Sequence, residues 1–117
     1  NRIVPGMKEQ GGGDIVNIAS TSGIRGHAGG TSYSASKWAV RGISQCWQAE
    51  LRPHDIRVIC VCPSEVQTAW GGKVGRNNPN KLYASDIADA ILAAISAESR
   101  ALWPELAVFA TNPWKEA

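Results

Sequence analysis

The sequence lacks the features that mark several classes of protein. It has two histidines, His27 and His54, with no cluster of carboxylates beside them, and three cysteines without CxxC spacing. These counts predict neither a catalytic nor a structural metal, and no disulfide framework. No apolar run approaches the roughly 20 residues that a helix needs to span a bilayer, so we expect no membrane partner.

The chain also has only a small excess of one sign of charge. Twelve Lys and Arg residues stand against ten Asp and Glu residues, a net charge of +2, and the basic residues are scattered along the chain. Nucleic acid is therefore not an expected partner. The chain has 117 residues, of which 44% are hydrophobic and 19% charged, and this composition is typical of one globular domain with one core.

Short apolar runs between turn residues predict three buried strands. The first covers residues 15–19 and follows the glycines at 11–13, which are expected to form a loop. The second covers residues 56–62 and ends at Pro63, and the third covers residues 106–110. Cys60 and Cys62 share one face of the second strand, where buried thiols behave as small apolar side chains.

Two helices are predicted between these strands, over residues 32–52 and 86–98, the second capped by Ser85 and Asp86. Their expected apolar faces carry Trp38, Ile43, Cys46, Trp47 and Leu51 on the first helix and Ile87, Ile91, Leu92 and Ile95 on the second. Residues 20–31, rich in Ser, Thr and Gly, are expected to lack regular structure. The alternation predicts a parallel α/β sheet with right-handed crossovers and helices on both faces.

Ser20, Tyr33 and Lys37 form the constellation most suited to chemistry. Tyr33 and Lys37 are four residues apart at the start of a helix and so lie one turn apart on one face. A lysine cation favours the phenolate, which makes a tyrosine a better proton donor and acceptor. Ser20 follows the first strand, at the edge where parallel sheets bind ligands. The alternatives are a chance Tyr-x-x-x-Lys pair and a serine hydroxyl that bonds only loop backbone.

The motifs as a set resemble the short-chain dehydrogenase/reductases. The resemblance rests on Tyr33-Ser-Ala-Ser-Lys37, on Ile15-Val-Asn-Ile-Ala-Ser20, on Pro63-x-x-Val66-x-Thr68, and on the helix-to-strand passage over residues 50–58. It covers residues 4–114. It implies the C-terminal, catalytic half of a doubly wound, Rossmann-type domain over residues 1–117, whose N-terminal dinucleotide-binding half is absent from this chain. The first residues fit the end of a helix.

The resemblance implies an oxidoreductase that moves a hydride between NAD or NADP and a small carbonyl or secondary alcohol. Tyr33 would be the general acid/base, Lys37 would favour its phenolate and bind the nicotinamide ribose, and Ser20 would polarise the substrate carbonyl. Pro63, Ser64, Val66 and Thr68 would line the cofactor, with the Val66 backbone at the carboxamide and Thr68 near the phosphates. A cytoplasmic homodimer or homotetramer is also implied.

Two departures from the family pattern bear on cofactor binding. Ser64 stands where the family usually has glycine, and its side chain is expected to crowd the nicotinamide or to need a different backbone angle. The chain also has no Gly-rich turn after a strand to receive a pyrophosphate. Gly71-Gly72-Lys73 lacks P-loop spacing and is expected to lie in a substrate-side loop over residues 69–82.

Five tryptophans, many for this length, leave a further question open. Trp38 and Trp47 lie on the helix that begins with the Tyr/Lys pair, and they suit core packing and a subunit interface equally well. Trp70 is a candidate to cover substrate. Two rival readings remain beside the reductase: a truncated, non-catalytic fragment that serves as an oligomerisation or interaction subunit, and a small stand-alone binding domain.

Overall fold

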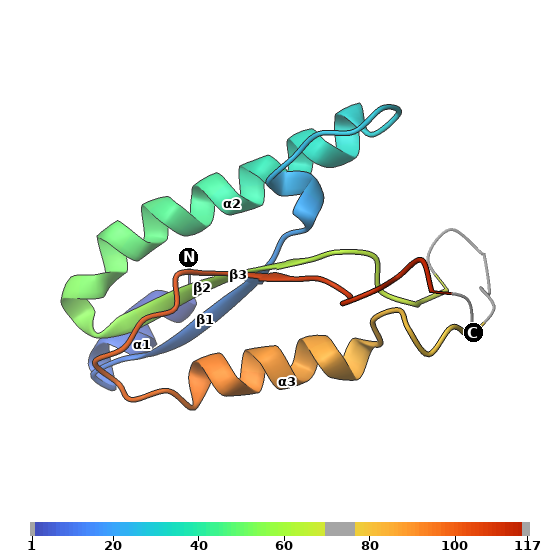
Figure 1. The fold of residues 1–117 in the computed structure, drawn as a ribbon. Helices are drawn as coiled ribbons and strands as arrows, with labels where there is room; N and C mark the ends of the chain where they lie inside the picture. The colour runs from blue at the N-terminus through green and yellow to red at the C-terminus, as the bar shows by residue number, and fades with distance from the viewer. Residues whose placement is uncertain (1, 70–76, 116–117) are drawn as a thin grey trace.

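The computed structural model describes residues 2–69 and 77–115, drawn in colour in Figure 1. Its elements, in chain order, are α1 (Ile3–Glu9), β1 (Gly13–Ile18), η1 (Thr21–Gly23), α2 (Thr31–Leu51), η2 (Arg52–His54), β2 (Ile56–Pro63), α3 (Ala84–Ile95) and β3 (Glu105–Val108). The predicted loop over residues 69–82 lies partly outside the described residues, and Trp70, Gly71, Gly72 and Lys73 fall in that part. None of the described helices is both long and apolar enough to cross a membrane.

The three strands form a parallel sheet in the order β1-β2-β3. Ile15 of β1 lies opposite Val58 of β2, and Cys60 of β2 lies opposite Glu105 of β3. Helix α2 covers one face of this sheet and α3 covers the other (Figure 1). The predicted parallel α/β architecture with helices on both faces is therefore confirmed.

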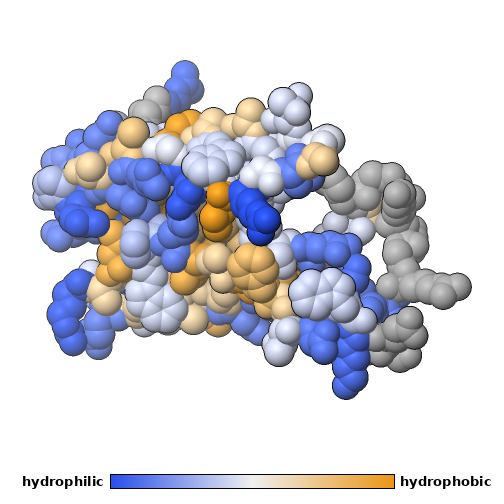
Figure 2. All heavy atoms as spheres, turned by 45° about the horizontal axis from the view of Figure 1, so that its top comes forward, coloured by the Kyte–Doolittle hydropathy of each residue, from blue (hydrophilic) through white to orange (hydrophobic). Residues whose placement is uncertain are grey.

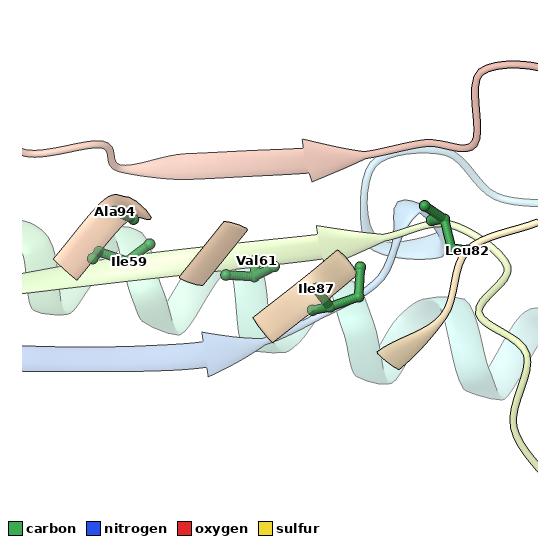
Figure 3. Packing of buried hydrophobic residues seen from close by; sticks show 5 residues of the cluster. All are labelled: Ile59, Val61, Leu82, Ile87 and Ala94. Atoms are coloured by element: carbon green, nitrogen blue, oxygen red, sulfur yellow. The ribbon is translucent and has the colours of Figure 1, made fainter. Parts of the chain in front are cut away.

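The face under α3 is an apolar core. Ile59 and Val61 project from β2 towards Ile87 and Ala94 of α3, and Leu82 closes one end (Figure 3). The predicted contact face of α3 is wrong in part, because Leu92 is 59% exposed. Ala94 takes the inward position instead, since a small side chain lets the helix lie close on the sheet.

The side of α2 that faces the sheet differs more strongly from the prediction. Its fully or mostly buried residues are Ser34, Ser44 and Leu51, and Trp47 packs beside Leu51. Ile43 and Cys46, predicted on the apolar face of this helix, are exposed, and Trp38, which suited the core and a subunit interface equally, is 47% exposed. Exposed hydrophobic side chains interrupt the polar surface on the side of the molecule that α2 covers (Figure 2).

Hydrogen bonds explain how α2 holds its polar face against the sheet. The Asn17 side-chain amide on β1 donates to the Ser44 hydroxyl (2.9 Å), which in turn donates to the Val40 carbonyl (2.8 Å). Gln48 donates to the carbonyls of Val58 (3.0 Å) and Pro104 (2.8 Å). The Ser44 and Gln48 side chains thus have partners, which makes a polar contact face tolerable, whereas the buried Ser34 hydroxyl has none among the described residues.

The ends of α3 also differ from prediction. The helix begins at Ala84, where the Asp86 carboxylate accepts from the Tyr83 backbone N–H at 2.7 Å. It ends at Ile95 rather than at residue 98, and Arg57 of β2 donates hydrogen bonds to backbone carbonyls at and after this end. The Arg57 guanidinium donates to the carbonyls of Ile95, Ala97, Glu98 and Ala101, at 2.9–3.3 Å, and to the Asp14 carboxylate.

The segment expected to be irregular, residues 20–31, contains one turn of 3₁₀-helix, η1. Ser20 caps this turn, because its hydroxyl accepts from the Ser22 backbone N–H at 3.1 Å. A serine cap of this kind satisfies an otherwise unpaired N–H at the start of a helical turn. The signal was present in the sequence as Ser20-Thr21-Ser22, and the expectation of no regular structure is wrong at this point.

Candidate active site

The candidate site lies at the carboxyl ends of β1 and β2. Ile18 of β1 is paired with Val61 of β2, and the Ala19 backbone N–H donates to the Val61 carbonyl at 2.8 Å. Ser20 and Pro63, each two residues beyond this pair, therefore emerge at the same edge of the sheet. The topology brings the predicted serine and the predicted cofactor segment together, although the sequence separates them by more than forty residues.

Ser20 itself is fixed by its loop. The residue is 8% exposed, and its hydroxyl oxygen accepts from the Ser22 N–H. The reading of Ser20 as a residue that satisfies loop backbone is thus confirmed. It does not exclude the second role, because a hydroxyl has one donor and two acceptor positions. The bond to Ser22 uses one acceptor position and orients the group.

Tyr33 and Lys37 lie one turn apart near the start of α2, as predicted. The Lys37 Nζ lies 5.7 Å from the centre of the Tyr33 ring, and it donates to the Ile18 carbonyl at 3.3 Å. Lys37 therefore links the first turns of α2 to the end of β1. The Tyr33 side chain remains 40% exposed, so its phenol can meet a ligand that approaches this edge.

Gly23 packs η1 against the same turns of α2. A Cβ atom built on Gly23 would lie 2.7 Å from the Lys37 carbonyl oxygen and 2.9 Å from its carbon, both backbone atoms. Such distances are shorter than van der Waals contact allows, so only glycine permits this approach. The loop that carries Ser20 and the turn that carries Tyr33 and Lys37 are in this way held together.

The predicted cofactor segment continues from β2 as an ordered strip. The Ser64 N–H donates to the Val108 carbonyl at 2.9 Å, and Val66 forms a parallel bridge with Leu82. Thr68 is exposed beyond this bridge. Among the described residues, Asp55 is the one non-glycine residue with positive φ, so Ser64 has an ordinary backbone angle. The bond to Val108 holds Ser64 in this conformation, and the expected effect of its side chain on cofactor binding stays a prediction.

Two concavities flank the sheet, and the larger is remote from these residues. It has a volume of about 690 Å³ and lies at the amino ends of the strands, beside Gly13, Asp55 and Arg57. Arg57 is already engaged by carbonyls and by Asp14, so it has little capacity left for an anion. The second, about 480 Å³, lies at the carboxyl edge, where Leu82, Asp86 and Phe109 contribute to its wall.

Sequence reasoning missed the polar residues that seat α2. Ser44 lies two helical turns after Lys37 and is fully buried, with Asn17 as its partner. Arg41 lies between them on the same side and pairs with Glu105 of β3 at 2.6 Å. The seven-residue spacing from Lys37 to Ser44 was a usable signal, because residues seven apart share a helix face. A prediction based on apolar residues alone did not use this spacing.

Comparisons with known proteins agree with this arrangement. A sequence profile for short chain dehydrogenases matches residues 1–79. An uncharacterized oxidoreductase of Staphylococcus saprophyticus is 38% identical over 99 residues, which are 85% of this chain and 42% of that protein.

Solved structures give the same result. Serine dehydrogenase from Escherichia coli has a TM-score of 0.77 at 29% identity, over 91% of this chain and 44% of that chain. The closed form of serine dehydrogenase complexed with NADP+ has a TM-score of 0.82 at 28% identity, over 91% of this chain and 47% of that chain. The present chain thus spans less than half the length of each of these proteins.

Proposed function

Because this chain belongs to the short-chain dehydrogenase family, we propose that it carries the catalytic residues of a reversible carbonyl reductase. The reaction is hydride transfer between NAD or NADP and a small carbonyl or secondary alcohol. One observation carries the proposal. The Lys37 ammonium lies over the Tyr33 ring and donates to the carbonyl of Ile18, two residues before Ser20.

The three side chains divide the work on the substrate oxygen. The Ser20 hydroxyl, oriented by Ser22, donates to the carbonyl oxygen and holds it at the sheet edge. Tyr33 gives its phenolic proton to that oxygen during reduction and accepts a proton from the alcohol during oxidation. Lys37 stabilises the negative charge on the phenolate that reduction leaves behind. The nicotinamide, when bound, supplies or accepts the hydride.

The residues at the carboxyl edge suit a nicotinamide cofactor. Lys37 has three N–H donors and one bond to Ile18, which leaves donors for ribose hydroxyls. The strip from Pro63 to Thr68 begins at the same edge, and the Ser64 N–H anchors it to the Val108 carbonyl. A related protein, serine dehydrogenase, has been solved in complex with NADP+, which supports a dinucleotide of this class.

Self-association is part of the proposal, and one observation favours it. Trp38, Ile43 and Cys46 lie on the outward side of α2 and are exposed. A stripe of this kind on a helix buried on its other side is typical of a subunit contact. A homodimer or homotetramer would cover it. We also propose a cytoplasmic location, because all three cysteines are free thiols, as a reducing compartment favours.

The test is made on the natural full-length protein. Tyr33→Phe is expected to lower kcat for carbonyl reduction by about 10²–10⁴-fold, the usual contribution of a general acid, while NADPH or NADH binding measured by fluorescence stays near wild type. Tyr83→Phe is the matched control. Tyr83 directly precedes α3, its hydroxyl donates to the Asn77 side chain, and it takes no part in the proposed chemistry.

Undiminished turnover in Tyr33→Phe would overturn the proposal. Absence of cofactor binding and turnover in the wild-type protein, together with self-association through the outward side of α2, would favour the rival function. In that case the chain serves as a non-catalytic interaction subunit that keeps the family's fold.

A further inference from the structure

Two buried thiols and a carboxylate converge between the sheet and α2. Cys60 and Cys62 alternate along β2 and so point to the same side, with their Sγ atoms 4.0 Å apart. Glu105 lies opposite Cys60 in the β2–β3 register. A ligand atom from each of the three residues lies within 4.8 Å of the other two. No other group of this kind occurs in residues 2–69 and 77–115.

We propose that Cys60, Cys62 and Glu105 bind a thiophilic divalent cation such as Zn²⁺. Tetrahedral zinc holds sulfur ligands at about 2.3 Å, which places two such sulfurs about 3.8 Å apart. The observed separation of 4.0 Å is close to this value, so neither thiol has to change its strand position to bind. A mixed sulfur and oxygen ligand set, with one open position for water, is ordinary zinc coordination.

The charges in this cluster balance when the cation is bound. Binding replaces two thiol protons, M²⁺ + 2 RSH → M(SR)₂ + 2 H⁺, and both protons leave to solvent. With the Glu105 carboxylate the metal group carries a net charge of −1. Arg41, whose Nε donates to Glu105 at 2.6 Å, supplies the opposite charge. The bond to Glu105 raises the pKa of Arg41, so its guanidinium remains charged.

Both thiols lie in a buried cluster, and a cation that binds them has to displace their protons. The cation must therefore compete with protons, and its affinity is expected to rise with pH. This favours metals with a strong preference for sulfur over Mg²⁺ or Ca²⁺, which prefer oxygen ligands.

A route to the cluster lies on its carboxylate side. The thiols themselves are buried beneath Ala19, Ile24 and Val40. The side chains of Arg41 and Glu105 are 23% and 29% exposed, so a cation can first meet Glu105 and then the sulfurs. Glu105 contacts Arg41 through Oε2 and has a second oxygen for the metal.

Occupation of this site would affect the end of β1. Ala19 packs against both thiols and precedes Ser20 directly. A bound cation would join β2 to β3 directly below this point. A ligand that binds the native state raises Tm, by an amount that grows with the logarithm of its concentration relative to Kd, so occupancy has a readout independent of enzyme activity.

The experiment titrates the purified, reduced protein with Co²⁺ and Zn²⁺. Thiolate-to-cobalt charge-transfer absorption is expected to appear, with release of about two protons per metal ion and displacement by Zn²⁺. Cys60→Ala and Cys62→Ala should each abolish the absorption. Cys46→Ala is the matched control, since Cys46 is the exposed third thiol on α2, and it should leave the absorption unchanged. Glu105→Gln should weaken binding by about tenfold or more.

A measurement on the unmodified protein guards against variants that fail to fold. Zn²⁺ should slow alkylation of Cys60 and Cys62, mapped by mass spectrometry after partial unfolding in urea, and leave Cys46 as reactive as before. Absence of charge-transfer absorption at millimolar Co²⁺ would overturn the proposal. Absorption that survives Cys62→Ala, or that is lost in Cys46→Ala, would do the same.

Discussion

Helices α2 and α3 cover opposite faces of the same sheet, yet they hold it by different means. Helix α3 presents Ile87 and Ala94 to the apolar side chains Ile59 and Val61. Helix α2 presents Ser44 and Gln48, whose side chains form hydrogen bonds to Asn17 and to the Val58 carbonyl. It carries its largest apolar side chains, Trp38 and Ile43, on the other side.

The difference shows what hydrophobic periodicity measures. A helix that meets only the sheet on its apolar side turns that side inward, as α3 mostly does. A helix with exposed apolar residues on its outer side and satisfied polar residues on its inner side is suited to two neighbours. In α2 the polar inner face also positions Lys37, which must reach the Ile18 carbonyl.

The largest expected effect is on the α3 side. Ile59→Ala removes a fully buried side chain from the cluster with Val61 and Ile87 and should lower the free energy of unfolding by about 2–5 kcal/mol. Leu92→Ala on the exposed side of α3 is the control, with an expected change within about 0.5 kcal/mol. Urea unfolding followed by circular dichroism measures both. Equal losses would mean that α3 does not pack as described.

Arg57→Met tests the polar contact that ends α3. The variant leaves the Asp14 carboxylate and several carbonyls without their donor and should cost about 1–3 kcal/mol in urea unfolding. Arg100→Met is the control, because Arg100 forms only an exposed pair with Glu98 and should matter by less than about 0.5 kcal/mol. If both variants lose the same stability, Arg57 has no special part in the α3 junction.

A double-mutant cycle tests the hydrogen bond between Asn17 and Ser44 that joins α2 to the sheet. Ser44→Ala and Asn17→Ala should each lower the free energy of unfolding by about 1 kcal/mol, since each leaves a buried polar partner unpaired. The double variant should lose less than the sum of the two, because the shared bond is then counted once. Strict additivity would show that the two residues act independently.

The smallest effect on stability is expected at the outer side of α2. Trp38→Ser and Ile43→Ser should change the free energy of unfolding of the monomer by less than about 1 kcal/mol, because both side chains are about half exposed and only Trp38 has a ring contact, with Arg41 at 5.4 Å. Self-association, measured by sedimentation at several protein concentrations, should weaken in both variants. A molecular mass that does not change with either substitution would contradict a subunit contact on this side.

Much of this fold follows from sequence patterns. The continuous apolar runs before Ala19 and Pro63 identified β1 and β2 within two residues of their ends. The parallel order followed from the alternation of elements. The inward side of α2 did not follow, because side-chain hydrogen bonds such as Asn17 to Ser44 join residues far apart in the chain. The pattern of apolar residues along the chain does not report such hydrogen bonds.

The candidate site divides in a similar way. Local spacing and topology placed Tyr33 and Lys37 together and Ser20 at the same sheet edge, and their catalytic roles remain predictions. The approach of Glu105 to Cys60 was out of reach, because it depends on the register of two strands that are separated by more than forty residues. The expectation of no metal was drawn from spacing along the chain, and it stays a prediction that the Co²⁺ titration of the proposed site tests.

Gly23 limits which sequences can keep this site. Any side chain at that position would meet the Lys37 backbone and force α2 away from the loop that carries Ser20. In a library with every amino acid at residue 23, selection for the fold alone and selection for turnover should therefore differ. Alanine is expected to survive the first and to be depleted by the second, so a position without any functional group becomes diagnostic of the chemistry beside it.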